Sequence, residues 1–169
     1  MSDDLHVTVF ADDPRIEALA SYTDGIEELA AVFADANAGD GELLDRRPAD
    51  GAWSVAEVLH HLADAELHQT VRLRQMLAED CPEWAPWDEE AYAATLLYDV
   101  RPAADALTLV LSLRHVNSRL LASLSAEQWR RTAVHPVHGE VDVAGWVAIA
   151  AEHLKTHVLQ ARRAVVGMI

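Results

Sequence analysis

Two histidines in the C-terminal part of the chain have a spacing that suits metal binding. His153 and His157 are four residues apart in an apolar repeat of helical period, so both rings lie on one face of the predicted helix. Two imidazoles at this spacing can hold one metal ion, because their Cβ atoms are about 5–6 Å apart. The same pattern also fits histidines buried in a core or groove without a metal. Further ligands must therefore decide between the two interpretations.

A third candidate ligand lies in another amphipathic segment, which begins at a Ser54–Glu57 capping box. In that segment His61 shares the phase of the apolar repeat, and the adjacent His60 does not. Helical bundles build metal sites from side chains that project inward from facing helices. Together with the C-terminal pair, His61 would give three neutral nitrogens and at least one open position, as in catalytic metal sites.

The elements that must position these histidines are predicted to be four long helices. Apolar periodicity and helix start and stop signals place them at residues 13–37, 54–76, 102–121 and 142–166. On the third helix the apolar stripe includes Val116, and Asn117 lies off it. We expect an all-α four-helix bundle that forms a single domain over residues 1–169.

The connections differ sharply in length. Three prolines and an acidic group between Asp80 and Pro102 predict a long crossover between the second and third helices, with a short helix near 91–97. Residues 132–140 are predicted to be a loop, and we see no convincing strand period in the chain. Residues 1–12 are expected to form a loose arm or an extended lead-in.

Composition limits the possible partners. The 169 residues carry 13 Lys plus Arg against 28 Asp plus Glu, a net charge of −15, which opposes binding to nucleic acids or anionic membranes. No apolar run approaches the roughly 18–20 residues of a membrane span and the start of the chain lacks a signal-peptide pattern, so we expect a cytoplasmic protein. Cys81 is the single cysteine, which excludes an intramolecular disulfide and a cysteine-based zinc knuckle.

Four segments in matching order resemble a known family, the DinB/YfiT-like metal-binding four-helix bundles. They correspond to its second helix, its crossover, the loop before its last helix and its terminal histidine pair: Trp53–Asp64, Pro86–Tyr92, His135–Gly139 and His153–His157. The resemblance covers most of the chain and implies a metal triad of His61, His153 and His157. The sequence departs from the YfiT branch at Thr156 and Gln160, where relatives often carry further histidines.

The resemblance implies several activities: metal-dependent transferases that use bacillithiol, mycothiol or glutathione, a thiol-dependent isomerase, and metal-dependent hydrolases. A divalent ion with an open position, zinc or nickel foremost, would convert a thiol into a thiolate or lower the pKa of water to about 7. No residue has the sequence position of a general base. We therefore expect a transferase that takes a low-molecular-weight thiol as co-substrate and passes its sulfur to an electrophilic small molecule. The alternatives are a hydrolase and a non-catalytic metal-binding stress protein.

The remaining polar candidates have weaker patterns. Three further histidines are more typical of exposed or loop positions: His68, His135 and His138. Glu57 and Asp64 are expected to cap their helix and to orient a metal ligand. Five tryptophans in a small chain, together with the resemblance, predict a homodimer.

Overall fold

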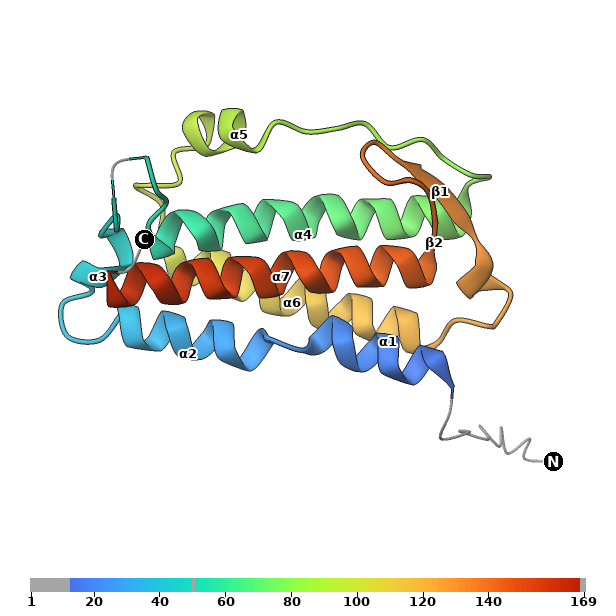
Figure 1. Cartoon of the computed structure of the whole chain (residues 1–169), viewed down its shortest axis with the longest axis horizontal. Helices are drawn as coiled ribbons and strands as arrows, with labels where there is room; N and C mark the ends of the chain where they lie inside the picture. The colour runs from blue at the N-terminus through green and yellow to red at the C-terminus, as the bar shows by residue number, and fades with distance from the viewer. Residues whose placement is uncertain (1–12, 50, 168–169) are drawn as a thin grey trace.

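Four long helical segments form the body of the molecule in a computed structural model, which describes residues 13–49 and 51–167 (Figure 1). The expected arm at residues 1–12 lies outside the described residues. The elements in chain order are α1 (Pro14–Thr23), α2 (Ile26–Ala36), α3 (Glu42–Asp45), α4 (Val55–Ala78), α5 (Glu89–Thr95), α6 (Ala103–Ala122), the 3-10 turn η1 (Gln128–Arg130), β1 (Thr132–His135), β2 (Gly139–Asp142) and α7 (Val143–Val166).

The order of the helices confirms a four-helix bundle with a long crossover. The α1–α2 segment and α7 run in one direction, and α4 and α6 run in the other (Figure 1). Since α4 and α6 are parallel, residues 79–102 must return along the whole bundle between them, and they carry α5 on the way. Within the described parts of the chain, no helix is long and apolar enough to cross a membrane.

The first helix is not continuous, contrary to the prediction for residues 13–37. It breaks between α1 and α2, where Gly25 has a φ of +91°, a left-handed conformation that favours glycine. Asp24 precedes the break and pairs with Lys155 of α7 at 2.9 Å. The apolar spacing continues across the break because both halves pack on the same neighbours, so periodicity alone does not reveal it.

The ends of α4 and α7 fix the register of the predicted metal ligands. The Ser54–Glu57 capping box is present in both directions, and Glu57 also pairs with Arg47. At the start of α7, the Asp142 side chain accepts a hydrogen bond from the Gly145 backbone at 2.8 Å. The helix ends at Gly167 in the left-handed conformation, as the sequence predicts.

The predicted loop at residues 132–140 is a β-hairpin. Strands β1 and β2 pair antiparallel, with Thr132 opposite Asp142 and His135 opposite Gly139. The crossover adds to the outer edge of β1, since the Trp84 N–H donates to the Val134 carbonyl at 3.0 Å. Strands of four residues are too short for a clear period of two, and the single proline and glycine of this segment, Pro136 and Gly139, indicated a loop.

The core has two apolar clusters with a buried polar group between them along α4, α6 and α7. Arg114 and Asn117 of α6 are fully buried in this polar group, whereas Val116 is 48% exposed. The predicted inner face of the third helix was therefore right at Ala106, Val110 and Leu121, which are buried, and wrong at Val116. Apolar spacing could not reveal the whole face, because two of its inward positions carry polar side chains that bond to α4: Arg114 donates to Glu66, and Asn117 donates to Thr70.

Candidate metal centre

Three histidines from two neighbouring helices converge on one point, as the sequence predicts. The His61 Nε2 atom of α4 lies 3.1 Å from His153 Nε2 and 3.0 Å from His157 Nε2, both on α7. Nitrogens bound to one first-row cation at about 2.0–2.1 Å come to lie about 3 Å apart. Among the described residues, only this group of three or more His, Cys, Asp or Glu side chains has the spacing for a shared ion.

Burial keeps these imidazoles neutral, which is the form that binds metals. It lowers the pKa of His61 to about 3, with smaller contributions from His157 and His153. Burial also lowers the pKa of His153 to about 3, helped by the positive charges of His157 and Arg114. The pKa of His157 is lowered by burial too, although its hydrogen bond to Gln160 opposes the shift.

The hydrogen bonds around the triad test whether these residues fit a cation. The Gln160 Oε1 atom accepts from His157 Nδ1 at 2.7 Å, which leaves the His157 Nε2 lone pair facing the other two rings. The buried His61 Nδ1 has no hydrogen-bond partner among the described residues. The His61 Nε2 atom faces the other two rings, so it is the nitrogen through which His61 would bind a cation. Three convergent neutral nitrogens fit a divalent metal.

A carboxylate that sequence analysis missed lies beside the triad. Glu89, the first residue of α5, places its Oε2 atom 3.7 Å from His61 Nε2, and its side chain is 55% exposed. The sequence shows only an acidic group in a crossover, and no local pattern indicates that this crossover folds back over His61. The structure therefore supplies the general-base candidate that the sequence did not reveal.

Two indoles enclose the remaining sides of His61. Trp87 of the crossover stacks on its ring at 5.6 Å and 14°, and Trp53 lies at 4.9 Å. Both indoles are only partly buried, whereas the other three tryptophans, Trp84, Trp129 and Trp146, lie in the core. The packing of this chain alone accounts for all five tryptophans, so the predicted homodimer rests on the resemblance and stays a prediction.

The triad lies between two cavities. One, of about 290 Å³, is bounded by α4, the crossover and the hairpin, and its lining includes His68, Arg72 and His138. The other, of about 360 Å³, is lined by Trp53, Glu90, His157 and Gln160 among others. His153 and Glu89 line both cavities. Two separate molecules could thus approach the same group of nitrogens.

The structure places the weaker candidates around the triad and outside it. His60 is buried and its Nε2 bonds to the Arg101 carbonyl at 3.1 Å, so it fixes the crossover. His68 stacks on Trp87 at 4.6 Å. His135 and His138 pack together in the hairpin, at 4.7 Å between rings.

Glu57 and Asp64, the acids expected to cap their helix and to orient a metal ligand, have hydrogen-bond partners outside the triad. Asp64 accepts a hydrogen bond from Tyr98 of the crossover. Glu57 caps α4, as expected. Neither bonds to a histidine of the triad within the described residues. The ligand-orienting role expected of these acids belongs to Gln160 instead.

Comparison with known proteins gives the family. The profile of the DinB superfamily matches residues 16–161. The chain belongs to the DinB superfamily. A DinB relative from Oceanobacillus iheyensis, provisionally named metal-dependent hydrolase OB0782, is 33% identical over 119 residues, which cover 70% of this chain and 69% of the relative. YfiT of Bacillus subtilis, with the same provisional function in its name, is 28% identical over 129 residues, which cover 76% of this chain and 69% of YfiT.

A solved structure supports the fold independently. The structure of Bacillus subtilis YfiT, described as a probable metal-dependent hydrolase with an unusual four-helix bundle topology, superposes with a TM-score of 0.78. The superposition covers 93% of this chain and 89% of YfiT at 22% identity. This chain thus shares its four-helix bundle fold with YfiT.

Proposed function

We propose that this protein is a metal-dependent transferase that passes the sulfur of a low-molecular-weight thiol to an electrophilic small molecule. The observation that carries the proposal is the position of the triad between two cavities, because a transferase needs two substrates at one reacting centre. The triad of His61, His153 and His157 would hold a divalent cation, with zinc and nickel as first candidates. When bound, such an ion lowers the pKa of a thiol beside it and so raises the fraction of thiolate at neutral pH.

The chain's own residues would position and deprotonate the thiol. Gln160 holds the tautomer of His157 that directs a lone pair to the centre. Glu89 is exposed at the mouth of both cavities and would accept the proton of the S–H group. The sulfur would then form a bond to the electrophilic carbon. In a displacement the leaving group would depart with the bonding pair, and in an addition to an activated alkene the displaced pair would take up the proton that the thiol gave up. Trp53 and Trp87 limit the access of water to His61.

The cellular setting follows from the proposed co-substrate. Low-molecular-weight thiols such as bacillithiol, mycothiol or glutathione are kept reduced in the cytosol. We therefore place the reaction in the cytoplasm, with the protein as a homodimer, as its family resemblance suggests.

Hydrolysis is the second candidate, and one observation favours it. Water is a far weaker acid than a thiol and needs a base, and Glu89 lies 3.7 Å from His61 Nε2. The provisional names of the relatives point the same way. In this reaction Glu89 would take a proton from the attacking water, and one cavity would hold an ester or amide.

One assay separates these functions. Chelated protein is reloaded with zinc or nickel and given bacillithiol, mycothiol, glutathione or cysteine with chlorodinitrobenzene, and separately 4-nitrophenyl esters and amides. The proposal predicts metal-dependent thiol consumption that is lost in His157→Gln. Triad-dependent ester or amide cleavage without thiol consumption would establish the hydrolase instead. If neither reaction responds to metal, the protein is a non-catalytic metal-binding protein.

A further inference from the structure

The cavity between α4, the crossover and the hairpin holds a buried cation without a counter-ion. Arg72 is 7% exposed, and no carboxylate of the described residues lies within 4.0 Å of its guanidinium. Its single hydrogen bond within the described residues runs from Nη2 to the Ala85 carbonyl at 2.8 Å. A buried charge without a partner is costly, and this one persists in a chain with a net charge of −15.

A second polar group in the same cavity is also unsatisfied. Gln69 is 9% exposed, lines the cavity with Arg72, and its Oε1 atom has no hydrogen-bond partner among the described residues. Because the oxygen and nitrogen of a glutamine amide are interchangeable in a structure, the unpartnered atom can equally be an N–H donor. Gln69 and Arg72, three residues apart on α4, thus offer neighbouring donors on one helix face.

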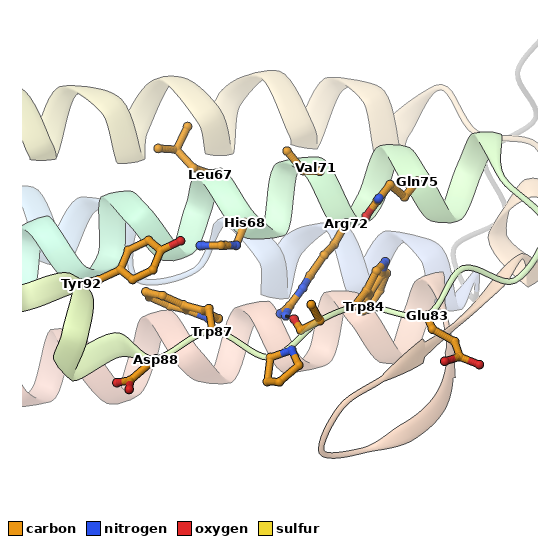
Figure 2. Close-up of a pocket in the computed structure, with 12 residues that line it drawn as sticks. Leu67, His68, Val71, Arg72, Gln75, Glu83, Trp84, Trp87, Asp88 and Tyr92 are labelled. Atoms are coloured by element: carbon orange, nitrogen blue, oxygen red, sulfur yellow. Dashed lines mark hydrogen bonds between the residues drawn. The ribbon is translucent and has the colours of Figure 1, made fainter.

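The space around Arg72 connects the triad to a wider groove. A cavity of about 800 Å³ under the crossover shares His68, Arg72, Pro86 and Trp87 with the cavity at the triad. Figure 2 shows the Arg72 side chain reaching from α4 to the crossover, between Trp84 and Trp87. The guanidinium carbon is 5.5 Å from the Trp84 ring centre. A ligand bound by Arg72 therefore lies in a passage that continues to His153.

The other polar residues that line the cavity of about 290 Å³ at the triad favour an anion bound to Arg72. Among the described residues that line it, the one acidic residue is Glu89, which faces His61. The remaining polar lining consists of His68, His135, His138 and His153, which can donate hydrogen bonds as neutral rings. A planar carboxylate matches the fork of a guanidinium better than other small anions of one charge.

We propose that Arg72 and Gln69 form a carboxylate subsite, which binds a carboxylate of the substrate and directs its reactive end to the triad. The inference rests on the proposed function for the identity of the substrate, but the binding itself does not require the metal. The carboxylate can belong to the thiol or to its acceptor. Either molecule would enter through the groove under the crossover.

The binding test uses metal-free protein and a matched pair of probes, benzoate and its neutral analogue benzamide. Nitrogen-15 NMR follows the side-chain amide of Gln69 and the indole N–H groups of Trp84 and Trp87 during titration. We expect benzoate to shift these signals saturably and benzamide not to. Equal binding of the two probes, or no binding of benzoate, would overturn the carboxylate subsite.

Variants separate binding from folding. Arg72→Gln should weaken benzoate binding by about tenfold or more, and Gln69→Leu by about three- to tenfold. Gln69→Leu removes an unsatisfied buried group, so the melting temperature should stay level or rise while benzoate binding falls. The control for Arg72→Gln is Arg119→Gln, which makes an equal charge change at an exposed position of α6. The control for Gln69→Leu is Gln75→Leu, at a residue that lines the groove under the crossover but not the cavity at the triad. Benzoate binding that survives both test variants, or falls equally in the controls, would refute the site.

Turnover then identifies the molecule that carries the carboxylate. Cysteine is compared with cysteamine, and monomethyl fumarate with dimethyl fumarate, in wild type and Arg72→Gln. A KM that rises only for cysteine assigns the carboxylate to the thiol, and one that rises only for monomethyl fumarate assigns it to the acceptor. If neither KM responds, the substrate assignment is wrong. Benzoate binding without metal-dependent turnover would keep the subsite and refute the transferase, so the two failures are distinguishable.

Discussion

Two polar clusters lie side by side within the bundle, one fully buried and one partly buried, and they differ in how completely their polar groups are hydrogen-bonded. The ionic cluster consists of Tyr22, Glu66, Arg114 and Asn117. In it Arg114 donates to Glu66 at 2.7 Å and to the carbonyls of Tyr22 and Ala150. The triad of His61, His153 and His157 instead directs three nitrogens at one another, with one nitrogen of His61 unpartnered.

This difference separates a structural role from a functional one. The ionic cluster joins α1, α4, α6 and α7, and its groups complete one another without any ligand. The triad borders two cavities, and the lone pairs of its three convergent Nε2 atoms could all be taken up by one cation between them. We therefore expect changes in the ionic cluster to alter stability, and changes in the triad to alter ligand binding.

The largest expected effect comes from removing the central cation of the ionic cluster. Arg114→Met leaves the Glu66 carboxylate buried without its partner, so the free energy of unfolding should fall by about 3–5 kcal/mol in urea denaturation. The double variant Arg114→Met with Glu66→Leu should recover most of this loss, because no unpaired charge remains. A loss below about 1 kcal/mol in the single variant would show that the ionic cluster does not hold the helices together.

The next largest effect is expected on acidification, because the neutral histidines of the triad make stability depend on pH. In metal-free protein the pKa values of His61 and His153 are about 3, whereas those of an unfolded chain are about 6.5. Between these values the unfolded state binds more protons, so stability falls as the pH drops from 6.5 toward 3. The melting temperature of His153→Gln should fall less steeply over this range than that of wild type. If the melting temperatures of His153→Gln and wild type fall in parallel with pH, His153 is not held neutral in the folded protein.

A smaller effect is expected from losing the hydrogen bond that orients one of the three metal ligands, His157. Gln160→Leu removes the acceptor of His157 Nδ1, which should weaken cation binding by about 10–100-fold in calorimetry. Thr156→Ala, an exposed position on the same helix, is the control and should bind as wild type does. If the two variants bind the cation equally well, Gln160 does not orient the ligand.

The smallest expected effect concerns the helix break that positions the Tyr22 carbonyl for Arg114. Gly25→Ala puts a side chain at a φ of +91° and should cost about 1–2 kcal/mol of unfolding free energy. Gly39→Ala carries similar strain, with φ +71°, far from the ionic cluster in sequence. Cation binding should be unchanged in both, because the triad lies on α4 and α7. If Gly25→Ala binds the cation more weakly and Gly39→Ala does not, the ionic cluster and the triad are energetically coupled.

The triad and the bundle were predictable because they depend on local rules. Spacing of four residues sets the phase of His153 against His157, and a capping box sets the start of the helix that carries His61. Glu89 and Arg72 were not predictable as site residues. Their positions depend on the path of the crossover, which is fixed by long-range bonds such as Arg72 to Ala85 and Trp84 to Val134. The inward polar residues of α6 were missed for a different reason: they break the apolar spacing, and their partners lie on other helices of the bundle.

We expect the triad to hold one divalent cation. The most direct test is a calorimetric titration of chelated protein with zinc and with nickel, with elemental analysis of the product, for wild type and His157→Gln. We expect one ion per chain in wild type and a loss of that binding in His157→Gln, with the helical circular dichroism of the two proteins unchanged. No stoichiometric binding in wild type, or equal binding in the variant, would contradict it.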